Sequence, residues 1–298
     1  MKKLTVIIAS SLCLSMIAVA ASAKEALLQT TANKSIKQDY VNTDAGQLHF
    51  WEAGEGPVLL LIHQSSSSGE EYAAMVPYMA EKYRLIAFDW PGHGGSDDPV
   101  TELGVEEFTA SALAVLDYLG ISKAHVLGNH GGALIAMNLA WKHPQRVNRL
   151  ILSGTSGVKE EKESEEFTES LDLERRNQVD IEGKSLSDAW GRYRAYMPNS
   201  SAEEILIPYL NNVTTRLRPY DAHYGVLRWD RRPALASLKD KRTLLMQGER
   251  DDFVSHQETL LKTLLNGERV VVENAGVFMF FEKPEASAKA VLKFLDSQ

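Results

Sequence analysis

The chain has 298 residues, of which 44% are hydrophobic and 24% are charged, and its formal net charge is −8. This length and composition are typical of a soluble globular protein with one large α/β domain that carries an insertion. The excess of acidic side chains argues against a broad surface for nucleic acid or anionic membranes, so the expected partner is a small molecule.

The N-terminal segment, residues 1–23, has the pattern of a signal peptide. Lys2 and Lys3 precede an apolar run over 4–20, and Ala21-Ser22-Ala23 then supplies the small residues of a cleavage site. The sequence therefore predicts an exported protein, periplasmic or secreted, that has no contact with the membrane after cleavage. The alternative is an uncleaved anchor, but an apolar run of about 17 residues is short for a membrane span.

The single cysteine of the chain is predicted to be absent from the mature protein, which would begin at Lys24. Cys13 lies inside the signal segment, behind Leu12, which is too large for the small residue that a lipoprotein signal has there. The mature chain then has neither a disulfide nor a cysteine metal site.

Short apolar runs that alternate with helical or loop-rich sequence predict a mostly parallel sheet covered on both faces. Ile36–Tyr40 and Gln47–Ala53, joined through a turn at 43–46, form a predicted hairpin at the antiparallel edge of this sheet. The other predicted strands are Val58–Ile62, Arg84–Phe88, Ala124–Leu127, Arg149–Leu152, Thr243–Met246 and Arg269–Val272.

Several segments between these strands have apolar residues at the three- and four-residue spacings of a helix. These predicted helices are Glu70–Lys82, Val105–Leu119, Gly131–Lys142, Gln257–Leu265 and Pro284–Leu295. Pro284 suits the first turn of the last helix, because its missing N–H would have no partner there.

A different composition marks residues 158–232, which interrupt the order of strands. An acidic run over Glu160–Glu174 opens this segment and is interpreted as a solvated helix face. Aromatic residues follow, and some of them would face inward if the segment covers an apolar pocket. They are Trp190, Tyr193, Tyr196, Tyr209, Tyr220, Tyr224 and Trp229. The segment is predicted to be a helical cap.

A set of short motifs stands at the ends of the predicted strands. In chain order, they are His63 with the small-residue loop after it, Asp89-Trp90-Pro91-Gly92-His93-Gly94-Gly95-Ser96, Gly128-Asn129-His130-Gly131-Gly132 with Pro144 beyond it, Gly248-Glu249-Arg250-Asp251, and Ala275-Gly276-Val277 with the segment that leads to Pro284.

Together these motifs resemble those of the α/β-hydrolase superfamily, in its capped, single-domain type, over residues 36–295. The resemblance implies an α/β-hydrolase fold, which is a mostly parallel sheet flanked by helices with an inserted helical cap. The hydrolase core would then comprise residues 24–157 and 233–298, and the cap residues 158–232.

The resemblance fails at the catalytic triad. The family's nucleophile elbow reads G-x-S-x-G, and His130 stands in place of its serine. Val277 stands where the family has its catalytic histidine, whereas Asp251, with Asp252 as the neighbouring alternative, matches the triad acid. Without a hydroxyl at position 130, the usual acyl-enzyme cannot form there. The chain is therefore predicted to have a degenerate triad and not to be a standard serine hydrolase.

The two substitutions together suggest that the histidine has moved to the elbow. From there the His130 imidazole could meet Asp251 directly, and its second ring nitrogen would serve as a general base. Backbone N–H groups at Gln64, Ser65 and Gly131 are the expected oxyanion donors. This interpretation predicts a non-standard hydrolase that acts on a small ester, lactone or related carbonyl compound.

Two other functions stay open at this point. The chain could be a catalytically inactive pseudo-hydrolase that binds a small ligand in the capped pocket. A serine of the run Ser65-Ser66-Ser67-Ser68 could also replace the lost nucleophile, with His63 as its base, although serine runs are more often solvated turns.

The remaining histidines carry less weight. His93 and His143 are interpreted as structural, whereas His223 and His256 are less favoured candidates for site residues. Asp251 and Asp252 with a nearby histidine suggest a metal centre, but the chain has no ligand motif such as H-E-x-x-H, so neither a metal nor a cofactor is expected.

Overall fold

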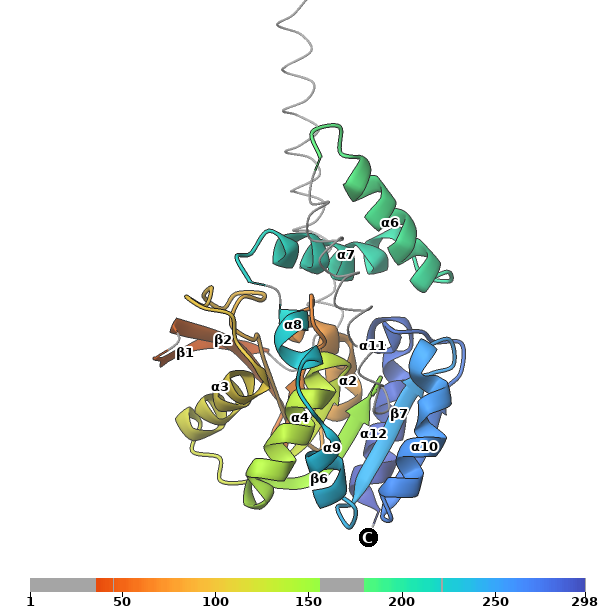
Figure 1. Ribbon diagram of the computed structural model, residues 1–298. Coiled ribbons are helices and arrows are strands. Elements are labelled where there is room, and N and C mark those ends of the chain that lie inside the picture. The colour runs from red at the N-terminus through yellow and green to blue at the C-terminus, as the bar shows by residue number, and fades with distance from the viewer. Residues whose placement is uncertain (1–35, 45, 156–179, 221, 298) are drawn as a thin grey trace, which may run out of the picture.

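The structure, a computed structural model, describes residues 36–44, 46–155, 180–220 and 222–297. These residues form an eight-stranded sheet with the strand order β1-β2-β4-β3-β5-β6-β7-β8 (Figure 1). The strands are β1 Lys37–Thr43, β2 Gly46–Ala53, β3 Val58–Ile62, β4 Arg84–Phe88, β5 Ala124–Asn129, β6 Val147–Ser153, β7 Thr243–Gly248 and β8 Gly267–Val272.

The pairing of the strands confirms the predicted mostly parallel sheet with an antiparallel edge. Strands β1 and β2 form an antiparallel hairpin, and β2 is also antiparallel to β4. The other neighbours are parallel. Because parallel strands end at the same edge of a sheet, the segments that follow β3, β5 and β7 approach one another there, although they lie far apart in the sequence.

Helices cover the sheet where the apolar spacing predicts them. Four of them begin at the predicted residues: α3 Val105–Tyr118, α4 Gly131–Lys142, α10 Gln257–Thr263 and α12 Pro284–Asp296. Shorter helical segments are the 3₁₀-helices η2 Pro144–Arg146 and η3 Asp252–His256 and the α-helix α11 Met279–Glu282.

The predicted helix Glu70–Lys82 is wrong in type and length. The segment instead forms a 3₁₀-helix, η1 Gly69–Met75, followed by the short α-helix α2 Val76–Met79. Pro77 lies in the first turn of α2. It has no N–H to donate and restricts the residue before it, so an α-helix starts at this point more readily than it continues through it.

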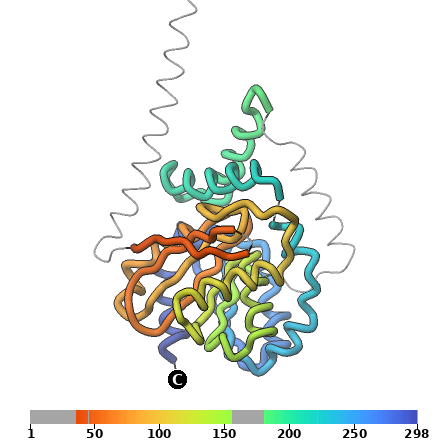
Figure 2. Tube along the Cα trace, turned by 90° about the vertical axis from the view of Figure 1, so that its left-hand side faces the viewer, coloured from red at the N-terminus to blue at the C-terminus, as the bar shows by residue number. Residues whose placement is uncertain are grey.

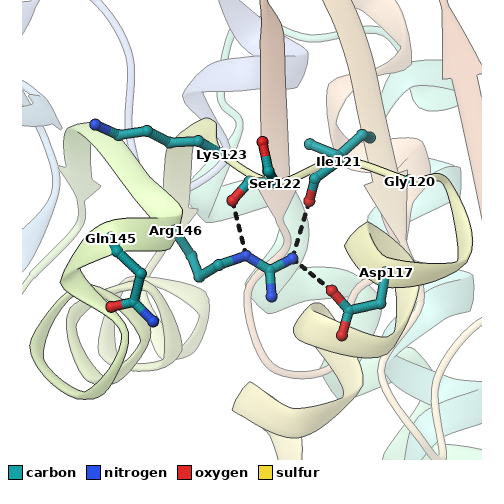
Figure 3. A pocket seen from close by; sticks show the side chains of 7 residues that line it. All are labelled: Asp117, Gly120, Ile121, Ser122, Lys123, Gln145 and Arg146. Atoms are coloured by element: carbon teal, nitrogen blue, oxygen red, sulfur yellow. Dashed lines mark hydrogen bonds and ion pairs between the residues drawn. The ribbon is translucent and has the colours of Figure 1, made fainter.

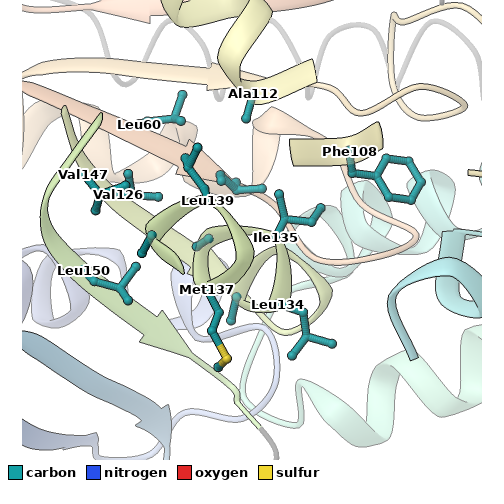
Figure 4. Close-up of a cluster of buried hydrophobic side chains, with 14 of the residues drawn as sticks. Leu60, Phe108, Ala112, Val126, Leu134, Ile135, Met137, Leu139, Val147 and Leu150 are labelled. Carbon is teal, nitrogen blue, oxygen red and sulfur yellow. The ribbon is translucent and has the colours of Figure 1, made fainter. Parts of the chain in front are cut away.

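Successive residues of the central strands face opposite sides of the sheet, as the pleat requires. Leu60, Val126 and Leu150 belong to a buried cluster with residues of α3 and α4, part of which Figure 4 shows. Leu59 and Leu127 belong to the cluster on the other face, which η1, α2 and α12 cover. Both faces are therefore dry, which accounts for the continuous apolar runs of these strands.

More helices lie between β6 and β7. They are α6 Lys184–Tyr196, α7 Ala202–Arg216, α8 Ala222–Leu227 and α9 Arg232–Ser237. Figures 1 and 2 place α6 and α7 at one end of the molecule and the C-terminus at the other end. The Asn211 Nδ2 donates to Ser68 Oγ at 3.2 Å, so α7 contacts the loop that follows β3. The predicted acidic face, 160–174, and the predicted signal peptide lie outside the described residues.

None of the helices in the described ranges is long and apolar enough to cross a bilayer.

Candidate active site

The site is built around His130, which stands on the tight turn between β5 and α4. Its backbone has φ 45° and ψ −111°, a conformation that non-glycine residues rarely adopt and that costs on the order of 1–3 kcal/mol. Gly132 makes the turn possible, because a Cβ there would lie 2.1 Å from the Ile62 carbonyl oxygen. The His130 N–H donates to Ser153 O at 2.8 Å and so ties the turn to β6.

The side chain of His130 contacts Asp251, as the sequence predicts. Its Nε2 lies 2.9 Å from Asp251 Oδ2, across 121 residues of sequence. Asp251 follows β7, and its Oδ1 accepts the Phe253 N–H at 2.9 Å. The Asp251 side chain is 3% exposed and that of His130 17% exposed, so the pair is shielded from water on the Asp251 side.

Gly154 makes room for the imidazole, and the sequence reasoning missed this residue. A Cβ at Gly154 would lie 2.3 Å from the Cδ2 and Nε2 atoms of His130, and the backbone there has φ +58°. Gly154 directly follows β6, the strand between β5 and β7. A glycine at the carboxyl end of this strand was the signal that could have revealed it.

Each member of the His130–Asp251 pair stabilises the charged form of the other. Burial alone would lower the pKa of His130, but the charge of Asp251 and its hydrogen bond outweigh burial and raise that pKa above its ordinary value. Burial alone would raise the pKa of Asp251, but the charge of His130 holds that pKa below its ordinary value. The imidazole therefore becomes neutral, as a base must be, only when the pH rises past its raised pKa.

Two of the expected oxyanion donors, the backbone N–H groups of Ser65 and Gly131, lie close together at the elbow. Within the described residues the amides of Ser65 and Gly131 have no acceptor, and a Cβ built on Gly131 would lie 3.4 Å from Ser65 N. The Gln64 N–H, also expected as an oxyanion donor, instead donates to Glu71 Oε2 at 2.9 Å. Of the three expected oxyanion donors, only the N–H groups of Ser65 and Gly131 therefore remain candidates.

His63 has no nitrogen left to activate a serine of the run at 65–68. Its Nδ1 lies 2.7 Å from Gln64 O, and its Nε2 accepts the Trp90 N–H at 3.2 Å. Burial lowers the pKa of His63 to about 4, so the ring is neutral and holds the loop by donating from Nδ1. This arrangement argues against a serine nucleophile with His63 as its base.

Val277 is part of an apolar contact between α6, α7 and the segment before α12. It packs against a cluster that contains Tyr193, Ile205, Phe278 and Phe281. Residues of the predicted cap and of the core therefore meet at the position where the resemblance places the catalytic histidine.

Glu71 is the second residue that the sequence reasoning missed. It lies in η1, is fully buried, and accepts hydrogen bonds from Gln64 N–H and from Asn129 Nδ2. Burial outweighs these two hydrogen bonds and raises the pKa of Glu71 to about 7. Sequence periodicity gives no sign that this carboxyl is buried, because Glu71 lies next to Glu70 within the predicted helix Glu70–Lys82.

The other histidines and acids form no metal centre within the described residues, where no group of three or more His, Cys, Asp or Glu side chains is placed to hold an ion. His93 has a structural role, because its Nε2 accepts the Ser66 N–H at 3.3 Å. His256 stacks on Phe253 at 5.6 Å between ring centroids.

A surface hollow lies away from this site, at the start of β5 (Figure 3). Arg146 crosses it and donates to Ser122 O at 2.9 Å and to Asp117 Oδ1 at 2.6 Å. These bonds hold the connection between α3 and β5, at the end of the strand opposite to His130.

Comparison with known families identifies the fold. The family model described as "alpha/beta hydrolase fold" matches residues 57–284. The protein belongs to this family.

Several of the similar proteins are named as hydrolases. A 2-hydroxy-6-oxononadienedioate/2-hydroxy-6-oxononatrienedioate hydrolase of Pseudomonas putida is 28% identical over 84% of this chain and 91% of its own length. A 2-hydroxy-6-oxo-6-phenylhexa-2,4-dienoate hydrolase of Burkholderia cepacia is 30% identical over 44% of this chain and 48% of its own length.

Solved structures share the fold at lower identity. A hydrolase from Pseudomonas aeruginosa has a TM-score of 0.71 at 22% identity, over 88% of this chain and 99% of its own. The enol-lactonase from Burkholderia xenovorans has a TM-score of 0.69 at 19% identity, over 87% of this chain and all of its own.

Proposed function

We propose that this protein is an exported hydrolase that cleaves a small ester, lactone or related carbonyl compound through a His130–Asp251 dyad, without a serine nucleophile. The observation that carries the proposal is the 2.9 Å contact between His130 Nε2 and Asp251 Oδ2 at the elbow. The Nε2–H of His130 donates a hydrogen bond to Asp251 Oδ2, so in the neutral imidazole Nδ1 carries the lone pair of a base.

In the proposed reaction, Nδ1 of neutral His130 takes a proton from a water molecule while the water oxygen attacks the carbonyl carbon. The carbonyl oxygen gains negative charge, and the N–H groups of Ser65 and Gly131 stabilise it. When the tetrahedral intermediate collapses, the leaving oxygen takes the proton back from the imidazolium. The products are a carboxylic acid and an alcohol, and the dyad returns to its starting state.

The two named relatives support a small substrate with a carbonyl group. Their names describe hydrolases of hydroxy-oxo-dienoates and related compounds. The strained backbone of His130 also supports a functional role, because such conformations persist where the surrounding structure enforces them and they cluster at active sites.

The proposal is tested by the hydrolysis of short p-nitrophenyl esters and of lactones. His130→Ala and Asp251→Ala should each lower kcat/KM by about 10²-fold or more, because each removes the general base or its orienting partner. His143→Ala at the end of α4, outside the site, is the matched control and should retain activity. Unchanged turnover in His130→Ala would overturn the proposal.

A rebuilt triad separates an altered enzyme from a protein that only binds a ligand. A fluorophosphonate probe, which reacts with activated serines, should not label the wild-type chain. If the wild type is inactive and the double variant His130→Ser with Val277→His is active, the protein is a non-catalytic binder with an intact fold, and the proposed dyad fails.

The proposal includes removal of residues 1–23 and a helical cap over 158–232 that borders the site. The contact of Asn211 in α7 with Ser68 supports a cap that reaches the loop after β3. Mass spectrometry of the protein recovered from the periplasm or medium should find Lys24 as the first residue. A full-length chain in the membrane fraction would contradict export by cleavage.

A further inference from the structure

Glu71 lies at the centre of a buried hydrogen-bond network between the two parts of the site. One part is the oxyanion loop, residues 64–68, and the other is the elbow around His130. The carboxylate accepts the Gln64 N–H at 2.9 Å with one oxygen and the Asn129 Nδ2 with the other. It is the one side chain in the described residues that bonds to both Gln64 and Asn129.

On the loop side, these contacts set the direction of the Ser65 N–H. The Gln64 carbonyl is held by His63 Nδ1 at 2.7 Å and by the Ser67 N–H at 3.2 Å. Because the peptide is planar and trans, the Ser65 N–H points opposite to this carbonyl. Glu71 holds the preceding peptide through the Gln64 N–H, so both peptides that flank Gln64 are held in place.

On the elbow side, the network continues to His130. Asn129 Oδ1 accepts the Ser153 hydroxyl at 2.7 Å, and Ser153 O accepts the His130 N–H at 2.8 Å. A continuous path of hydrogen bonds therefore runs from the Gln64 amide through Glu71, Asn129 and Ser153 to the backbone of His130.

Burying a carboxyl at position 71 costs more free energy than burying an apolar side chain of similar size. Glu71 and its neighbour Tyr72 are both fully buried, and an apolar side chain at position 71 would avoid the desolvation of a charge. What an apolar side chain cannot provide is an acceptor for each of two donors on different elements.

We propose that Glu71 is a positioning residue that holds the oxyanion loop against the elbow, so that the amides of Ser65 and Gly131 lie side by side. This inference rests on the proposed function for its effect on the rate, but the effect on the loop is independent of any activity. Glu71 does not touch the reacting atoms in this scheme.

Two substitutions separate the hydrogen bonds of Glu71 from its charge. In Glu71→Gln, the side-chain oxygen can still accept the Gln64 N–H, and the amide group can donate to Asn129 if the Asn129 amide flips and then donates to Ser153 Oγ. In Glu71→Leu, both bonds are lost. Glu81→Gln, which changes an exposed glutamate after α2, is the matched control.

The first readout is amide hydrogen exchange of residues 62–68 in the full chain, measured by mass spectrometry. Glu71→Leu should speed the exchange of this segment by about tenfold or more, since the buried hydrogen bond that holds the Gln64 N–H is lost. Glu71→Gln and Glu81→Gln should stay close to the wild type. Wild-type exchange rates in Glu71→Leu would overturn the proposal, whether or not the protein shows turnover.

The second readout is ester hydrolysis. Glu71→Leu should lower kcat by about 10²-fold, the typical effect of a displaced oxyanion donor, with little change in KM, and Glu71→Gln should restore most of the rate. If the loop loosens while kcat is unchanged, the positioning role is refuted. If the wild type itself is inactive, the proposed function fails, and the exchange data alone decide whether Glu71 holds the loop.

Should Glu71→Leu fail to fold, Asn129→Ala breaks the same network from the elbow side. It should also speed exchange in residues 62–68 and lower kcat. Unchanged exchange in that variant would overturn the proposal equally.

Discussion

The pH dependence of stability provides a quantitative test of the buried carboxyl. Burial raises the pKa of Glu71 from 4.5 to about 7 in the folded protein. The folded state therefore holds this proton more tightly than the unfolded state does. The stabilisation is fully present below pH 4.5 and is lost as the pH rises through 7. At 1.36 kcal/mol for each pH unit between the two pKa values, the loss amounts to about 3 kcal/mol.

Glu71→Gln replaces the carboxyl with an amide that does not titrate, and should therefore remove this pH dependence of stability. The free energy of unfolding of the variant, measured relative to the wild type, should rise by about 3 kcal/mol between pH 4.5 and pH 8. Any constant cost of rearranging the Asn129 amide cancels in this comparison, because it is present at both pH values.

Urea unfolding followed by tryptophan fluorescence at pH 4.5, 6, 7 and 8 measures the difference. Glu81→Gln, which changes an exposed glutamate after α2, serves as the control. A constant difference between Glu71→Gln and the wild type across this range would refute the assignment of a raised pKa to Glu71.

Three further outcomes follow from the same structure. Asp251→Asn should lower the pKa of His130, because the carboxylate that favours the charged imidazole is lost while the burial that opposes this charge remains. NMR titration of the imidazole measures this pKa, and an unchanged value would contradict the ion pair. Gly154→Ala should separate His130 from Asp251 and lower kcat/KM by about 10²-fold, because the new Cβ would stand 2.3 Å from the ring; wild-type kinetics would show that the ring does not lie there. Leu60→Ala should destabilise the fold by about 2–5 kcal/mol, because the side chain is fully buried in the cluster of Figure 4, and a calorimetric loss below about 1 kcal/mol would contradict that packing.

The sequence by itself determined the elements that local patterns encode. Apolar runs located the strands, and the three- and four-residue spacing located α3, α4, α10 and α12. The resemblance of the glycines around His130 to a nucleophile elbow predicted the tight turn there. These features depend on neighbours within one or two turns of chain, so they can be predicted from one sequence. The prediction for Glu70–Lys82 was wrong because Pro77 interrupts the pattern.

The tertiary structure decided which of these residues meet. His130 and Asp251 are 121 positions apart, and they come together because β5, β6 and β7 are neighbours whose carboxyl ends share one edge of the sheet. The same strand order places Gly154 next to the His130 imidazole. Local periodicity carries no information about such contacts, so the sequence could suggest the dyad only through resemblance to a family.

Burial likewise could be assigned only in three dimensions. The Gln64 N–H was expected to face an oxyanion, but it donates to Glu71, a carboxyl that the sequence shows as one acidic residue among many. Whether an acid is solvated or enclosed depends on what packs around it from distant segments, and this packing sets both its pKa and its hydrogen bonds.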